Sequence, residues 1–231
     1  MLCVLDTGVS TAEENMSRDA LLLSELEGDP ILHLYDWDGP SATYGHFIEP
    51  KNHLDLAAVE SLSLSLARRP TGGGIVFHIW DYAFSFLMPS GHPLFSLNAL
   101  ENYRFVNTVV LEVMKEFLSH KPAGLIDQSL PIPGNDCQNF CMARPTQYDV
   151  VYKGAKIAGA AQRKTKKGYL HQGTISLSFP SEAFLRSVLL EKGDVVKAML
   201  SHTFVLCDEK GLKEMRLQIG KKLAEMFQRC L

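Results

Sequence analysis

Alternating and continuously apolar segments predict a set of short β-strands along the chain. Strands are predicted for residues 31–35, 41–44, 82–88 and 174–179. The last of these alternates strictly, so every second side chain shares one face of the strand. The first two lie on either side of a polar turn, which predicts that they pair with each other.

Apolar residues at helical spacing, together with helix-start signals, predict four helices. They cover about residues 11–27, 55–62, 96–119 and 212–230. The first begins at two overlapping capping boxes, in which Ser10 and Thr11 precede Glu13 and Glu14 by three residues. Ser96 is expected to cap the third helix, whose aromatic residues, Tyr103 among them, are expected to be buried in the core.

The second half of the chain combines a hairpin with a long irregular segment. Residues 149–152 and 155–160 flank Lys153-Gly154, a two-residue turn typical of a β-hairpin. Residues 129–145 are rich in Pro, Gly and Asn without periodicity, and unstructured segments of this length in compact domains are often functional. Strands and helices follow one another without regular βαβ alternation. The sequence therefore predicts an α+β fold with a mixed β-sheet flanked by helices.

Composition and charge exclude several classes of protein. At 231 residues the chain suits one domain, and its net charge of −3 argues against a nucleic-acid partner. No apolar run approaches the roughly 20 residues that cross a membrane, and the N-terminus does not resemble a signal peptide. The five scattered cysteines suit a reducing compartment, so a cytoplasmic location is expected.

A glycine-rich loop carries the strongest chemical signal in the sequence. Arg68-Arg69-Pro70-Thr71 leads into Gly72, Gly73 and Gly74, and apolar strand-like segments flank the loop on both sides. Consecutive backbone N–H groups without side chains form a concave nest that attracts anions, and the arginines add positive charge. The spacing matches neither the phosphate loop of nucleotide hydrolases nor the dinucleotide-binding fingerprint.

The loop and the residues after it resemble the signature Arg-Arg-x-Thr/Ser-Gly-Gly-Gly-x-Val-x-His of the lipoate–protein ligase A family. This family belongs to the larger group of biotin and lipoate ligases and octanoyltransferases. Four further segments are similar to family motifs and occur in the same order, so that the resemblance spans roughly residues 14 to 178. They are residues 14–19, 34–40, 154–163 and 170–175.

The resemblance implies a single catalytic domain over residues 1–231, without a C-terminal accessory domain. Attaching an acyl group to a lysine requires a cation where negative charge accumulates, and Lys156 in the predicted hairpin is the candidate. The resemblance adds that the family's corresponding lysine contacts the acyl carboxylate or the adenylate phosphate. It implies that the acyl group or adenylate is bound by Arg69, Thr71, Gly72, Gly73, Gly74, Val76, Phe77, His78, Gly159, Ala161, His171, Gly173 and Thr174.

Two kinds of chemistry remain open for this site. A ligase would activate lipoate or octanoate with ATP as an adenylate, and Asp149 occupies the position where family ligases hold Mg²⁺. In this chain the residue before it is Tyr148, where those ligases have asparagine. The three glycines at 72–74 favour a ligase, because the transferase branch commonly has arginine at the third position. The ligase is therefore the first interpretation.

The alternative is a cysteine-dependent octanoyl or lipoyl transferase. Residues 141–149 resemble the segment in which the cysteine of that branch accepts the acyl group, here Cys141. A thiolate is a good acyl acceptor, and a neighbouring lysine or arginine would activate it. A third interpretation is a relative without catalytic activity that binds a lipoyl-adenylate.

The partners follow from the resemblance as well. The acceptors would be the lipoyl domains of 2-oxoacid dehydrogenases and the H protein of glycine cleavage. Many family ligases carry an extra C-terminal domain, so a short ligase would need a separate accessory subunit or would act without one.

Overall fold

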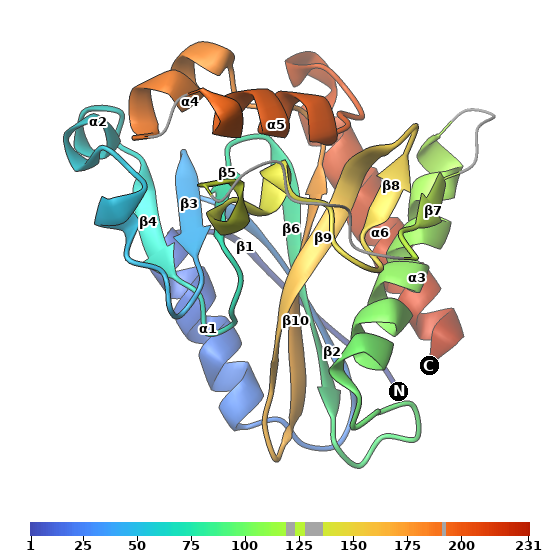
Figure 1. Cartoon of the computed structure of the whole chain (residues 1–231). Coiled ribbons are helices and arrows are strands. Elements are labelled where there is room, and N and C mark those ends of the chain that lie inside the picture. Colours follow the sequence, from blue (N-terminus) through green and yellow to red (C-terminus); the bar gives the residue numbers. More distant parts are fainter. Residues whose placement is uncertain (119–122, 128–135, 191–192) are drawn as a thin grey trace.

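Two β-sheets of different size form the framework of the protein (Figure 1). The computed structural model describes residues 1–118, 123–127, 136–190 and 193–231. The large sheet contains, in spatial order, β1 (Cys3–Ser10), β2 (Ile31–Trp37), β6 (Asp81–Pro89), β10 (Gly168–Ser176), β9 (Ala155–Lys164), β8 (Val150–Tyr152) and β7 (Ala123–Leu125). The small sheet contains β4 (Ser65–Arg68), β3 (Ser41–Tyr44) and β5 (Ile75–His78). Both sheets mix parallel and antiparallel pairs, as the predicted fold class requires.

Helices cover both faces of the large sheet (Figure 1). The helices are α1 (Ala12–Ser24), α2 (Leu56–Ser61), α3 (Ala99–Phe117), α4 (Glu182–Val188), α5 (Asp194–His202) and α6 (Leu212–Cys230). Short 3₁₀ turns are η1 (Pro50–Asn52), η2 (Asp136–Asn139), η3 (Cys141–Ala143) and η4 (Glu209–Gly211). Helices α3 and α6 pack together on one face, whereas α1 and the small sheet lie on the other.

Two apolar clusters account for most of the core. The larger one fills the space between the large sheet and helices α3 and α6, where the rings of Phe86 and Phe227 stack with centroids 4.4 Å apart. The second joins the small sheet to α4, α5 and the η2–η3 segment through side chains such as Phe77, Phe140 and Met199. Burying an aromatic or aliphatic side chain of this size contributes about 1.5–3 kcal/mol. The second cluster therefore holds the η2–η3 segment firmly against the small sheet.

The structure confirms several predicted elements. Thr11 caps α1 in a capping box with Glu14, and the hairpin between β8 and β9 turns at Lys153 (φ 53°) and Gly154 (φ 81°). The predicted cap of α3 is wrong, because Asn98 and not Ser96 is the cap residue, and its side chain accepts the backbone N–H of Leu100. Strand β10 covers residues 168–176 and so begins earlier than the predicted strand at 174–179.

The predicted pairing of residues 31–35 with 41–44 is wrong. Strand β2 has β1 on one side and β6 on the other, so neither of its edges is open to β3. The turn instead carries the chain into the small sheet, where β3 is the central strand. Sequence patterns also missed β1, β7, α4 and α5. In the segment 129–145 predicted as a loop, residues 129–135 lie outside the described residues, and η2 and η3 occupy residues 136–139 and 141–143.

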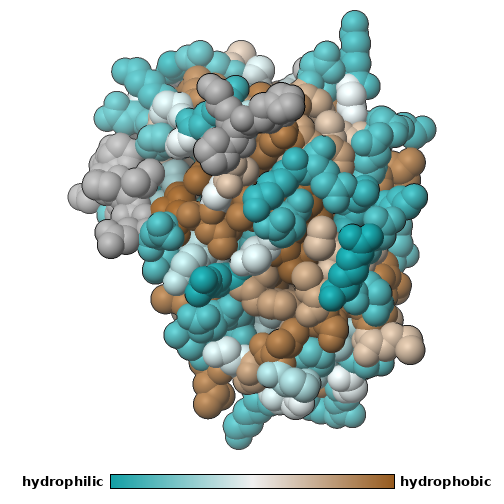
Figure 2. All heavy atoms as spheres, turned by 90° about the vertical axis from the view of Figure 1, so that its right-hand side faces the viewer, coloured by the Kyte–Doolittle hydropathy of each residue, from teal (hydrophilic) through white to brown (hydrophobic). Residues whose placement is uncertain are grey.

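The outer surface over α3 and α6 carries both hydrophilic and hydrophobic side chains (Figure 2). A shallow groove on the helix surface is lined by Phe105 and Val109 of α3 and by Cys230 at the end of α6. Within the described residues, no helix combines the length and the apolar character needed to cross a lipid bilayer.

The capping box of α1 gives a first prediction. Replacing Thr11 with alanine removes the side-chain acceptor for the backbone N–H of Glu14, so we expect the free energy of unfolding to fall by about 1 kcal/mol. Thr108→Ala is the matched control, because this exposed hydroxyl only bonds the carbonyl of Arg104 within α3. Urea unfolding followed by circular dichroism measures both. Equal effects of the two substitutions would contradict the assigned cap.

Candidate active site

A largely apolar cavity lies between the small sheet and the facing side of the large sheet. This cavity is lined by many of the residues that the sequence indicated for the site. They are Arg69, Val76, His78, Cys141, Lys156, Gly159, Ala161, Gly173 and Thr174. The motifs that are far apart in the sequence thus meet around one space.

The glycine loop is packed tightly against the segment that carries Cys141. Gly73 has φ +86°, a conformation that favours glycine, and a Cβ at this position would lie 3.6 Å from Cys141 Sγ. At Gly74 a Cβ would overlap the backbone carbonyl of Asn139 and lie 3.0 Å from the nitrogen of Phe140. The backbone N–H of Gly74 donates to Cys141 Sγ at 3.3 Å. Glycine at position 74 is therefore what allows the cysteine to approach the loop.

Arg69 holds the loop from inside the protein. Its guanidinium is buried and donates to the carbonyls of Gly72 (3.0 Å) and Gly74 (2.7 Å) as well as to both oxygens of Thr43. Burial lowers the pKa of Arg69, while the neighbouring Cys141 sulfur acts in the opposite direction. The guanidinium thus shapes the loop and places a positive charge beside the thiol. Arg68, in contrast, is exposed and pairs with Glu49.

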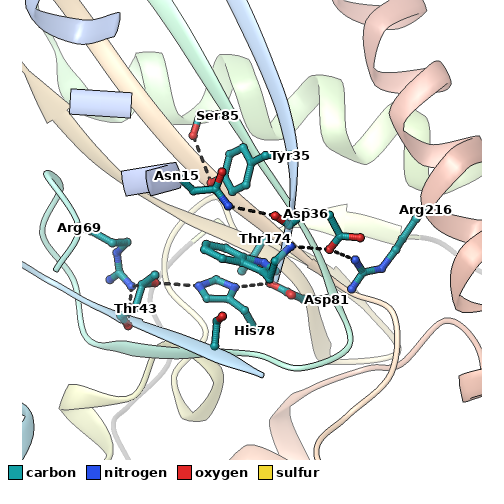
Figure 3. A network of polar contacts seen from close by, with 12 residues as sticks. Asn15, Tyr35, Asp36, Thr43, Arg69, His78, Asp81, Ser85, Thr174 and Arg216 are labelled. Carbon is teal, nitrogen blue, oxygen red and sulfur yellow. Dashed lines mark hydrogen bonds and ion pairs between the residues drawn. The ribbon is translucent and has the colours of Figure 1, made fainter. Parts of the chain in front are cut away.

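His78 belongs to a polar network that continues from Arg69 (Figure 3). Its Nε2 lies 2.8 Å from Thr43 Oγ1, and its Nδ1 lies 2.6 Å from Asp81 Oδ2, which also accepts from Thr174. Burial would raise the pKa of Asp81, but His78 and the hydrogen bonds outweigh burial and bring it below the ordinary value. The ring of Trp37 stacks on His78 at 4.1 Å. These contacts fix the position of the His78 ring at the cavity wall.

Lys156 forms an ion pair with a fully buried carboxylate. Its Nζ lies 2.8 Å from Asp149 Oδ2 and 3.2 Å from the carbonyl of Cys141, to which it donates. The other oxygen of Asp149 accepts from Tyr103 at 2.5 Å, and the amide and hydroxyl of Thr146 donate to Oδ2. Burial raises the pKa of Tyr103 well above its ordinary value, and Asp149 adds to the shift. Tyr103, predicted as a core residue, therefore orients this pair from α3.

A bulge and a glycine bring Lys156 to the cavity side of the sheet. The register between β8 and β9 shifts at Val150, so Val151 faces Lys156 while Val150 faces Ala158. At Gly159 a Cβ would lie 2.6 Å from Asp149 Oδ1 and would overlap the end of the Lys156 side chain. Gly159 lines the cavity, and its lack of a side chain also leaves room for the ion pair.

The residues present do not fit the predicted Mg²⁺ site. Both oxygens of Asp149 have hydrogen-bond donors, and one of these donors is the ammonium of Lys156. In the described parts of the chain, no group of three or more His, Cys, Asp and Glu side chains gathers in a way that could hold a metal ion. Asp149 serves to orient Lys156.

Six residues expected to bind the acyl group or adenylate do not line the cavity, namely Gly72, Gly73 and Gly74 of the loop and Thr71, Phe77 and His171. Phe77 points into the second apolar cluster, because side chains alternate along β5 and its neighbours Val76 and His78 take the cavity side. Thr71 is buried behind the loop, where its hydroxyl donates to Gln172. His171 lies on the opposite face of the large sheet against Phe84, and burial lowers its pKa to about 3, so it is neutral.

The chain matches the profile of the lipoyl protein ligase A/B catalytic domain over residues 11–203. It belongs to this family. The family assignment made from the five motifs is thereby confirmed, and so is the expectation of an enzyme of the ligase or transferase type.

A curated relative covers nearly the whole chain. The octanoyltransferase LipM of Kyrpidia tusciae is 30% identical over 240 residues, which is 99% of this chain and 86% of the relative. Solved structures of family members share the fold. The lipoate–protein ligase A structure with bound ATP gives a TM-score of 0.69 at 23% identity, covering 98% of this chain and 85% of that one. The bipartite lipoate ligase of Thermoplasma acidophilum with its E2 lipoyl domain gives 0.72 at 21% identity, covering 100% and 84%.

The cavity also contains residues to which sequence reasoning gave no role. Met16, Tyr35, Trp37 and Gln172 lie within the family motifs, but the motifs do not show which way their side chains point. Thr43 and Ala83 lie outside the motifs and reach the cavity through the pairing of their strands. The available signal for Gln172 was its place within the motif of residues 170–175.

The buried pair of Lys156 and Asp149 predicts strong energetic coupling in this family member. Lys156→Met leaves a fully buried carboxylate without its cation, so we expect a loss of roughly 3 kcal/mol in unfolding free energy. Adding Asp149→Asn removes the charge that lacks a partner. The double variant should therefore lose less unfolding free energy than the two single losses added together, by at least about 1 kcal/mol. Additive effects in urea unfolding would show that the pair does not stabilise the fold.

Proposed function

We propose that the protein is a cysteine-dependent octanoyltransferase that moves an octanoyl group from a carrier thioester to a lysine of a lipoyl domain. The observation that carries this proposal is the position of Cys141. Its sulfur accepts a hydrogen bond from the glycine loop at the cavity wall, beside the buried guanidinium of Arg69. A neighbouring cation and an N–H donor are surroundings typical of a cysteine that acts as a nucleophile.

In the first step the thiolate of Cys141 attacks the carbonyl carbon of the octanoyl thioester. A new carbon–sulfur bond forms, the bond to the carrier sulfur breaks, and the carrier leaves as a thiolate that takes up a proton. Negative charge develops on the carbonyl oxygen during this attack. The ammonium of Lys156, held 3.2 Å from the Cys141 carbonyl oxygen, supplies a nearby cation to stabilise that charge.

In the second step the amine of the acceptor lysine attacks the acyl-enzyme thioester. A carbon–nitrogen bond forms, the bond to Cys141 breaks, and the amine loses a proton as the thiolate is regenerated. The same cation stabilises the second oxyanion. Asp149 and Tyr103 keep Lys156 at that place and so act as positioning residues.

The ligase interpretation, placed first from the sequence, is supported less well. The carboxylate that would help to hold Mg²⁺ is occupied by Lys156. The third glycine, taken as a mark of ligases, has a local structural reason, because a side chain at 74 would displace the Cys141 segment. The relatives named octanoyltransferase LipM, in Kyrpidia tusciae and Bacillus subtilis, also favour transfer. ATP is then not required.

The proposal extends to the acceptor protein and to the need for an accessory subunit. The Thermoplasma acidophilum ligase was solved as a bipartite system with its E2 lipoyl domain, which supports a lipoyl domain as the acceptor class. We extend this to the lipoyl domains of 2-oxoacid dehydrogenases and to the glycine cleavage H protein. A thioester donor already carries an activated acyl group, so a single catalytic domain without a further subunit suffices. A role limited to binding is not favoured, because a non-catalytic relative would need neither the Cys141 contact nor the Lys156 pair.

Removing the nucleophile tests the proposal directly. Cys141→Ser should lower octanoyl transfer from the carrier thioester by about a thousandfold or more, the scale observed when a covalent nucleophile is removed. Intact-mass spectrometry should detect an octanoyl adduct on the native enzyme and not on this variant. Cys230→Ser, an exposed cysteine at the end of α6, is the matched control and should transfer normally. ATP-dependent attachment that survives Cys141→Ser would restore the ligase interpretation.

The glycine loop provides a second test with a matched pair of substitutions. Gly74→Ala should push away the Asn139 carbonyl and with it Cys141, and a misplacement of about 1 Å can cost about 100-fold in rate. Gly72→Ala should transfer near the native rate, because no atom lies within 4 Å of its added Cβ. Transfer rates and melting curves of both variants are compared. Equal transfer rates of the two variants at normal stability would mean that transfer does not need the approach of Cys141 to Gly74.

A further inference from the structure

A polar chain that is buried except at its Thr7 end runs from β1 through the core to the glycine loop, and the transfer steps do not use it. Its centre is the carboxylate of Asp19 on α1, which has no exposed surface. Asp19 Oδ1 lies 2.8 Å from Nδ1 of His33, whose Nε2 meets Thr7 at 2.9 Å. Asp19 Oδ2 accepts from Ser85 at 2.5 Å and from the Gln172 amide at 2.6 Å.

The carboxylate fixes the direction of every hydrogen bond between it and the loop. A carboxylate only accepts, so the amide nitrogen of Gln172 must face Asp19. The amide oxygen of Gln172 then faces Thr71 and accepts its hydroxyl proton at 2.7 Å. Thr71 directly precedes the three glycines, so the chain ends at the loop that donates to Cys141.

The chain and Arg69 hold the glycine loop from two sides. Arg69 binds the carbonyls of Gly72 and Gly74 from the side of the small sheet. Gln172, on β10 of the large sheet, binds the loop through Thr71. Ser85 also connects the chain to the cavity wall, because the hydroxyl of Tyr35 lies 3.4 Å from its Oγ (Figure 3). A loop of three glycines has high conformational freedom, and two anchors reduce it.

We propose that Asp19 and Gln172 are positioning residues that act through Thr71 to hold the Gly74 amide at the Cys141 sulfur. Asp19 orients the Gln172 amide, Gln172 fixes Thr71, and Thr71 fixes the start of the loop. Without this anchor the N–H of Gly74 would point at Cys141 for only part of the time, and the thiol would react more slowly. The expected effect on acyl transfer rests on the proposed function. The expected effect on the reactivity of the Cys141 thiol does not depend on that function.

Thr71→Val is the sharpest test, because it removes the hydroxyl and keeps the shape of the side chain. We expect alkylation of Cys141 by iodoacetamide at pH 7, followed by mass spectrometry of its peptide, to slow by about tenfold. Octanoyl transfer should lose a similar factor in kcat with little change in KM. Thr71→Ser keeps the hydroxyl and should restore both rates. Thr108→Val, on the outer surface of α3, should change neither.

Gln172→Met tests the next member of the chain. It should slow alkylation about as much as Thr71→Val, and the double variant should be no slower than either single variant, because both interrupt one path. Circular dichroism confirms that each variant is folded. Native alkylation rates in Thr71→Val and Gln172→Met would overturn the inference. Slowed alkylation in a protein that transfers no octanoyl group would instead support the anchor and reject the proposed function.

Discussion

The whole site depends on how closely the η2–η3 segment can approach the glycine loop. The backbone of Asn139 occupies the space that a side chain at Gly74 would need, and this contact brings the Cys141 sulfur to 3.3 Å from the Gly74 nitrogen. The second apolar cluster presses the segment into this position from the other side, through Phe140 and its neighbours. A few ångströms of separation would remove both the hydrogen bond to sulfur and the influence of Arg69 on it.

Three buried carboxylates in and behind the site each have a basic side chain and further hydrogen-bond donors within reach. Lys156 faces Asp149, His78 faces Asp81, and His33 faces Asp19. An unpaired buried charge is costly, so each pair fixes the position of both of its members. Lys156 and His78 line a cavity whose other walls are largely apolar, which suits a short acyl chain with a reactive carbonyl at one end. The same arrangement can stabilise an oxyanion without the rearrangement that water would need.

The sequence predicted elements well where the signal is local. The capping box at Thr11, the turn at Lys153-Gly154 and the final amphipathic helix all depend on residues that are neighbours in the chain. Prediction from the sequence failed where strand pairing is decided by residues far apart in the chain. Strand β3 leaves the large sheet because β1 and β6 already occupy both edges of β2, and nothing near residues 36–40 encodes that competition. Strand β1 went unpredicted because most of its side chains are exposed, so its pattern is weak.

The sequence by itself determined the family, the α+β fold and many of the residues around the cavity, since short motifs with fixed spacing need no tertiary information to be recognised. Only the tertiary structure decided which side chains face the substrate space. Phe77 and His171 lie within the motifs but point to the other faces of their strands. Asp149, expected at a metal, pairs with Lys156, and Tyr103, expected in the core, supports that pair. The physical reason is that a side chain's partners come from distant parts of the chain, and a bulge or a glycine decides whether they can meet.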